Sequence, residues 1–156
     1  MLSTKVVSVN CIKVQKGFSL IELITVVAII GILSAVGVIA YNGYISAAKK
    51  TSAQNIMQQI ALAQTEEYSN TGSYYANDSC DSPSVDTSRA IEDKLLGGAN
   101  VLTKFNSAGE RVAIFDYYAC IKEMVPGYEI IAVEDKDSDA CKITLDNNSV
   151  WVRENC

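Results

Sequence analysis

The feature that most constrains this chain is an apolar run near its N-terminus. Residues 23–41 carry no charged side chain. At about 1.5 Å of rise per residue, a helix of this run would be about 28 Å long, close to the hydrocarbon thickness of a bilayer. Glu22 stands directly before the run. An ionisable group carried into a membrane costs about 2 to 3 kcal/mol, so we expect Glu22 to have a role and a positively charged partner.

The sequence KGFSLIE at residues 16–22 supplies a candidate partner for that carboxylate. If the chain is cut after Gly17, Phe18 gains a free amine close to Glu22. This stretch resembles the N-terminus of type IV pilins and their relatives, in which a short basic leader ends in Gly before an aromatic residue. The resemblance implies that a prepilin peptidase cleaves between Gly17 and Phe18 and methylates the amine of Phe18. It also implies that Glu22 acts in assembly.

Two other interpretations of the N-terminus compete with this one. A secretory signal peptide cut after Ala40 would have the small residues Val38 and Ala40 before its cleavage site. Its apolar core would then be about eighteen residues, longer than the usual 7 to 15. A plain single-pass anchor explains the length but not the Gly17–Phe18 junction. Neither gives Glu22 a role.

The apolar character changes along the predicted helix. After residue 44, apolar residues recur at steps of three to five, which predicts one buried face on a helix that continues to about residue 69. This stripe consists of Ile45, Ala48, Ala53, Ile56, Ile60 and Ala63. We therefore divide the chain into a cleaved leader (1–17), a membrane-spanning and filament-core helix (18–44), and a globular head (45–156) that includes the amphipathic half of the helix.

The rest of the head has a short helical pattern followed by strand signals. Residues 88–96 predict a helix that ends at a Gly pair. Four short β-branched or aromatic segments, separated by turn residues, then predict strands at 111–122, 127–134, 141–145 and 150–154. The expected fold class is α+β, with a long N-terminal helix packed on an antiparallel sheet of about four strands.

Four cysteines follow the leader, and an even number on the exported side of a membrane indicates disulfides. Three pairings are possible. We favour Cys141 with Cys156, because a bond to the last residue would hold the chain end, and this leaves Cys80 with Cys120. The resemblance points the same way, since a disulfide commonly closes the C-terminal region of pilins.

Composition narrows the functions that the chain can have. The formal net charge is −5, so nucleic acid is not an expected partner except in a DNA-uptake role. There is no histidine, glycine-rich phosphate loop or GxSxG turn, so we expect neither an enzyme nor a cofactor. Asp135, Asp137 and Asp139 alternate like the start of a calcium loop, but the sixth position is Ala140 instead of Gly, which makes them a weak metal candidate.

The resemblance also implies partners and a location. A pilin would form a helical homo-oligomeric filament with the help of an inner-membrane assembly platform and a motor ATPase. It would cross the inner membrane once with a periplasmic head, then join an extracellular pilus that serves adhesion, motility or DNA uptake. The lysines before the apolar run favour this orientation. A type II secretion pseudopilin and a monomeric membrane-anchored binding module are the alternatives.

Overall fold

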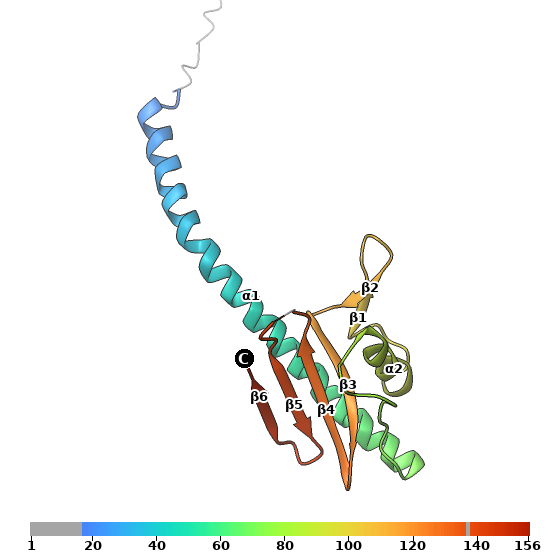
Figure 1. The fold of residues 1–156 in the computed structure, drawn as a ribbon. Coiled ribbons are helices and arrows are strands. Elements are labelled where there is room, and N and C mark those ends of the chain that lie inside the picture. Colours follow the sequence, from blue (N-terminus) through green and yellow to red (C-terminus); the bar gives the residue numbers. More distant parts are fainter. Residues whose placement is uncertain (1–16, 137) are drawn as a thin grey trace, which may run out of the picture. The chain divides into compact units, whose positions relative to one another are not determined.

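The computed structural model describes residues 17–136 and 138–156, so the predicted leader lies outside the described residues apart from Gly17. Figure 1 shows the elements in chain order. They are α1 (Leu20–Thr71), α2 (Val85–Leu95), β1 (Thr103–Phe105), β2 (Arg111–Ala113), β3 (Tyr117–Met124), β4 (Gly127–Glu134), β5 (Lys142–Asp146) and β6 (Trp151–Glu154). The chain divides into two units, Met1–Asn42 and Gly43–Cys156.

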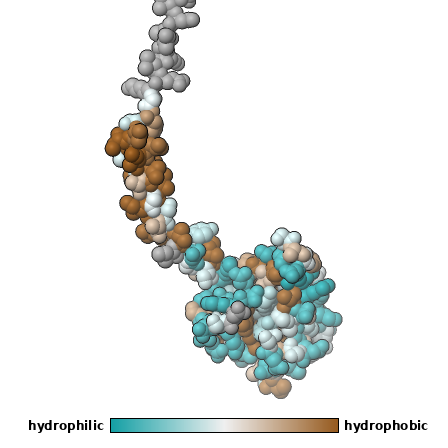
Figure 2. Space-filling model, turned by 45° about the horizontal axis from the view of Figure 1, so that its top comes forward, coloured by the Kyte–Doolittle hydropathy of each residue, from teal (hydrophilic) through white to brown (hydrophobic). Residues whose placement is uncertain are grey.

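The first half of α1 is apolar on all sides, and its side chains from Leu20 to Val38 are exposed. Leu20 is 75% exposed and Ile32 is 70% exposed. In Figure 2 brown, apolar side chains gather over this part of the helix. By length and composition α1 can cross a membrane, and none of its most apolar window is buried. Apolar surface of this extent needs a covering of lipid or of other helices.

The second half of α1 belongs to the unit Gly43–Cys156, which we call the compact unit, and packs one face into its core. Ala53, Ile56 and Ile60 are buried, as the periodicity predicts. Two residues outside the predicted stripe are also buried, Met57 and Gln64. The helix ends at Gly72, which adopts a positive φ of 79° and donates its N–H to the Tyr68 carbonyl at 2.8 Å. Such a left-handed residue is the common way to end a helix.

Four strands form one antiparallel sheet in the order β3-β4-β5-β6. Register places Ile121 opposite Ile130, and Ile130 opposite Leu145, so alternate residues of each strand share one face. That face forms a single core with α1 and with Ile91 of α2. The predicted α+β class and the four-stranded antiparallel sheet are confirmed.

The sequence interpretation was wrong about one strand and missed a hairpin. The segment predicted as one strand, 111–122, is divided between β2 and β3. Asp116 adopts a positive φ of 58° at the break, which a continuous strand does not allow. Its carbonyl accepts a hydrogen bond from the Asp135 N–H at 2.7 Å, and its carboxylate contacts Lys49 of α1. β2 instead pairs with β1 in a separate two-stranded sheet.

Tyr117, at the start of β3, makes the stability of the head depend on pH in the alkaline range. Burial, then the nearby carboxylates of Glu134 and Asp116, raise the pKa of Tyr117 from 10.0 to about 12. Between these two values the unfolded chain has released the proton and the folded chain retains it. The free energy of unfolding should therefore fall as pH rises from 10 to about 12. Denaturant titrations should show a shallower fall for Tyr117→Phe, and an identical slope in both proteins would contradict this assignment.

Candidate functional site

The predicted cleavage point lies in an exposed segment before the first helix. Gly17, Phe18 and Ser19 are all exposed and precede α1, which begins at Leu20, and the Ser19 carbonyl accepts the first helical hydrogen bond, from the Leu23 N–H at 3.2 Å. A Cβ atom added at Gly17 would meet nothing within 4 Å. The peptide bond between Gly17 and Phe18 is thus accessible to a peptidase in the described conformation.

Glu22 lies in the first turn of α1 and contacts the backbone just before it. Its Oε2 atom accepts a hydrogen bond from the Ser19 N–H at 2.9 Å. Ser19 and Glu22 have the spacing of a capping box, in which the Glu at the third helical position satisfies a free N–H group at the helix start. A carboxylate here is also favoured by the positive end of the helix dipole. Cleavage would create a free amine on Phe18, whose backbone nitrogen immediately precedes that of Ser19 in the chain.

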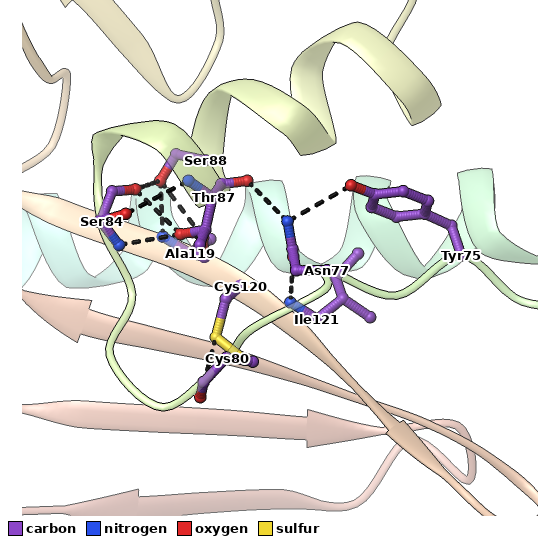
Figure 3. The surroundings of a disulfide bond; sticks show 9 residues. All are labelled: Tyr75, Asn77, Cys80, Ser84, Thr87, Ser88, Ala119, Cys120 and Ile121. Atoms are coloured by element: carbon purple, nitrogen blue, oxygen red, sulfur yellow. Dashed lines mark hydrogen bonds between the residues drawn. A yellow bond between two sulfur atoms is a disulfide. The ribbon is translucent and has the colours of Figure 1, made fainter.

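A second group of polar contacts covers the free edge of β3 (Figure 3). The N–H of Ala119 donates to Ser88 Oγ at 2.9 Å, and the N–H of Ile121 donates to Asn77 Oδ1 at 2.8 Å. The hydroxyl of Thr87 donates to the Ala119 carbonyl at 2.8 Å. An uncovered edge strand is a template for unwanted strand pairing, so α2 and the loop before it protect this edge.

Two disulfide bonds cross-link segments of the head. Cys80 is bonded to Cys120 of β3, which attaches the loop before α2 to the covered edge (Figure 3). Cys141, just before β5, is bonded to Cys156, the last residue. The carbonyl of Cys156 also accepts a hydrogen bond from Lys50 Nζ of α1 at 2.8 Å. The C-terminal end of the chain is thereby held to both the sheet and the helix.

The two disulfides should differ in their contribution to stability. They close loops with sequence separations of 40 and 15 residues. In the chain-entropy model these loops correspond to about 4 and about 3 kcal/mol. We expect the pair Cys80→Ala with Cys120→Ala to lower the thermal midpoint more than the matched pair Cys141→Ala with Cys156→Ala. Circular dichroism of both variants in detergent checks this, and the reverse order would contradict it.

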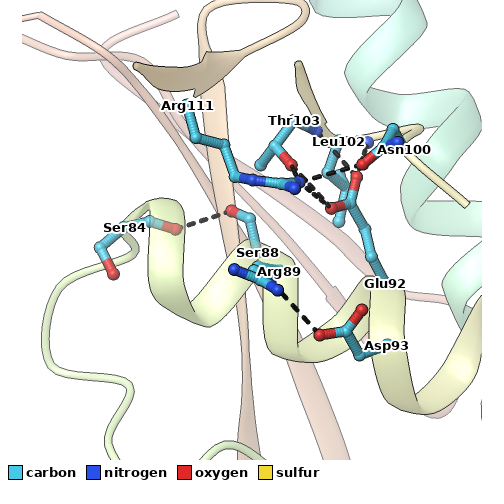
Figure 4. A network of polar contacts seen from close by, with 9 residues as sticks. All are labelled: Ser84, Ser88, Arg89, Glu92, Asp93, Asn100, Leu102, Thr103 and Arg111. Atoms are coloured by element: carbon cyan, nitrogen blue, oxygen red, sulfur yellow. Dashed lines mark hydrogen bonds and ion pairs between the residues drawn. The ribbon is translucent and has the colours of Figure 1, made fainter. Parts of the chain in front are cut away.

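A buried carboxylate in α2 holds the start of β1 (Figure 4). Glu92 is only 1% exposed. Its Oε1 atom accepts from the backbone N–H groups of Leu102 at 2.7 Å and Thr103 at 2.8 Å, and its Oε2 atom accepts from the Thr103 hydroxyl at 2.7 Å. Arg111 Nη1 lies 3.6 Å from Oε2 and balances the charge. Among the described residues no buried side-chain nitrogen or oxygen lacks a hydrogen-bond partner, which fits a structural role for this cluster.

The weak calcium candidate is only partly described. Asp137 lies outside the described residues. Asp135 Oδ2 accepts from the Tyr118 hydroxyl at 3.2 Å, and Asp139 adopts a positive φ of 50° in the turn. Within residues 17–136 and 138–156, no three His, Cys, Asp or Glu side chains are grouped so that they could hold a metal ion.

Several residues of these clusters were missed by sequence reasoning. Glu92 stands between Ile91 and Leu95 on the apolar side of its helix, and this unusual position was a signal for a buried carboxylate. Gln64 is fully buried and binds Tyr75 twice, through the Tyr75 carbonyl at 2.6 Å and the Tyr75 N–H at 2.9 Å. It occupies an apolar position of the helical period, but nothing in the sequence indicates its partner.

Comparison with known proteins decides how the N-terminal site is interpreted. Residues 12–38 match the family model described as the prokaryotic N-terminal methylation motif. The chain carries this methylation motif. The matched range includes Gly17, Phe18 and Glu22, and its described part, residues 17–38, consists of the exposed segment and the first turns of α1.

Curated relatives extend the similarity beyond the motif. A fimbrial protein of Neisseria meningitidis serogroup B is 40% identical over 87 residues, which is 56% of this chain and 50% of that protein. Fimbrial protein EcpC of Eikenella corrodens is 43% identical over 65 residues, 42% of each chain. The type IV major pilin protein PilE1 of Neisseria gonorrhoeae is 34% identical over 99 residues, 61% of this chain and 55% of that protein.

These matches confirm the resemblance to type IV pilins. The chain spans about half the length of the curated relatives it matches. No solved structure shows a significant match to it. The relatives are fimbrial structural proteins and not enzymes, in agreement with the interpretation of the composition.

Proposed function

We propose that this chain is a structural subunit of a type IV pilus. It would be held in the inner membrane by residues 18–44, cleaved and N-methylated by a prepilin peptidase, and polymerised into a surface filament. The assembly platform and motor ATPase of the inner membrane would be its partners. The names of its relatives favour a pilus subunit over a type II secretion pseudopilin or a monomeric binding module.

The exposed apolar half of α1 carries this proposal. A helix that is apolar on all sides and exposed over its whole most apolar window can be covered by lipid or by other helices. Identical copies are the simplest source of such helices once the chain leaves the membrane. The methylation motif at the start of the same helix supports this proposed move of the chain from the membrane into a bundle of identical helices.

Glu22 supports the proposal through its charge. After cleavage the Phe18 amine and the Glu22 carboxylate would be the two opposite charges at the start of the helix. A pair within about 4 Å gains roughly 1 to 4 kcal/mol at the dielectric of water or of a protein surface, and more where water is excluded. Pairing with the amine of a neighbouring copy would set the axial register between subunits.

Intact-mass measurement of the protein extracted from membranes tests the processing step. We expect a chain that begins at Phe18 and carries one added methyl group. Gly17→Leu is a suitable comparison, because a bulky residue before the cleavage point should leave the leader uncut. A wild-type mass that includes residues 1–17 would contradict the proposal and would favour a plain membrane anchor.

A further inference from the structure

The turn between β3 and β4 forms an apolar projection, which we call the knob (Met124, Val125 and Pro126). Val125 is 94% exposed, and Met124 is also exposed. Figure 1 places this turn at the lower end of the compact unit, and Figure 2 shows a brown patch at this end. Exposed apolar side chains that cluster at one point commonly mark an interaction site.

The knob is held in one shape by its neighbours. Gly127 follows it with a positive φ of 127°, and a Cβ atom there would lie 2.5 Å from the Asn147 side chain. The N–H of Asn147 donates to the Tyr128 carbonyl at 3.1 Å. The positive φ and the closeness of the Asn147 side chain together require glycine at the base of the knob.

A hollow of about 400 Å³ lies between α1 and the segments that flank β1 and β2. Its apolar lining is Ile56, Val101, Ile114 and Phe115, and its polar lining is Ser52, Asn55, Gln59 and Asn100. The hollow is a shallow depression that is open to solvent, so its lining is accessible to side chains of another molecule. All four polar residues are neutral, so an apolar group can enter without burying an unpaired charge.

The knob and the hollow lie at opposite ends of the head. Phe115 of the hollow lies two residues before Tyr117, the first residue of β3, and Met124 of the knob ends the strand. Eight strand residues span about 27 Å. α1 gives the same order, because Ser52 to Gln59 line the hollow whereas Tyr68 lies beside the knob. The hollow is therefore at the end where α1 enters the compact unit, and the knob is at the end where α1 stops.

We infer that the knob of one copy occupies the hollow of another copy of this chain. This inference rests on the proposed filament, in which all copies leave the membrane with the same orientation. The knob end of one head then faces the hollow end of the next. A contact between two different patches on identical chains is heterologous, and it extends without closing. Pro126 has no N–H, so entry of the knob buries one backbone donor fewer.

Cysteine pairing in assembled fibres tests the contact. Gln58 and Gln59 are exposed neighbours on α1, about 100° apart around the helix, and only Gln59 lines the hollow. Full-length chains with Val125→Cys and Gln59→Cys are expressed in bacterial cells that assemble the wild-type chain into fibres, and sheared fibres are oxidised mildly. We expect a ladder of cross-linked multimers on a non-reducing gel. The matched pair Val125→Cys with Gln58→Cys should give little or none.

A second measurement uses fibre yield. Val125→Asp should lose most of its fibres, whereas Val150→Asp, on the neighbouring β5–β6 turn, should retain them. Three results would each overturn the inference and leave the proposed function standing. The first is that fibres with Val125→Cys and Gln59→Cys form but give no ladder, and the second is that both cysteine pairs give equal ladders. The third is a normal fibre yield from Val125→Asp. Failure of the wild-type chain to enter fibres would instead overturn the proposed function.

Discussion

A chain with alanine in place of Glu22 is expected to be synthesised and cleaved at normal levels but to remain in the membrane. The carboxylate accepts a hydrogen bond from the Ser19 N–H at 2.9 Å, one residue after Phe18, whose amine the proposed cleavage would free. Loss of a pairing worth 1 kcal/mol or more per subunit corresponds to at least about a fivefold loss of assembled chain. Immunoblots of sheared fibres against the membrane fraction measure this ratio.

Glu22→Gln separates the two roles that the carboxylate can have. Glutamine can still accept the hydrogen bond of a capping box, but it carries no charge. If Glu22 acts by pairing with an amine, Glu22→Gln should fail like Glu22→Ala. Normal fibre yield from Glu22→Gln would show that helix capping is the role, and normal yield from Glu22→Ala would contradict any role in assembly.

Replacing Glu92 by alanine is expected to give a large loss of head stability. The change leaves two backbone N–H groups and the Thr103 hydroxyl without their acceptor, and it removes the partner of Arg111. Breaking a buried charge pair of this kind costs about 3 to 5 kcal/mol. For a domain of this size that loss should lower the thermal midpoint by roughly 10 to 25 °C, which circular dichroism in detergent would measure.

Asp93→Ala provides the control for that experiment. Asp93 is the next residue of α2, and its ion pair with Arg89 at 3.5 Å has side chains that are more than half exposed. Exposed pairs of this kind contribute about 0 to 1 kcal/mol, so a small shift is expected. Equal shifts from Glu92→Ala and Asp93→Ala would contradict the structural role of the buried cluster.

The long helix and the four-stranded sheet could be predicted because each depends on a local pattern. The change from apolar residues on all sides to one apolar stripe follows from the sequence alone, and alternation places Ile130 and Leu145 on the core face. The break at Asp116 could not be found in this way. Its positive φ is accompanied by contacts with Lys49 and Asp135, which are distant in the sequence.

The candidate functional residues also differ in whether a local sequence pattern could predict them. Gly17, Phe18 and Glu22 are close in sequence, so the resemblance of this short segment to pilin N-termini was enough to predict a cleavage point and an assembly residue there. The hydrogen bonds that cover the edge of β3 join residues about thirty or more positions apart, such as Ser88 with Ala119. The knob and the hollow depend on the placement of α1 and β3 together. A single sequence contains no local pattern for either.

The proposed function requires this chain to leave the membrane and become part of a filament. To test this, fibres are sheared from cells that make the full-length chain and are purified. They are then imaged by electron microscopy and analysed by peptide mass spectrometry. The account predicts thin fibres that contain this chain with a methylated Phe18 as its first residue. Fibres that lack the chain, with all of it found in the membrane fraction and still carrying residues 1–17, would contradict the account.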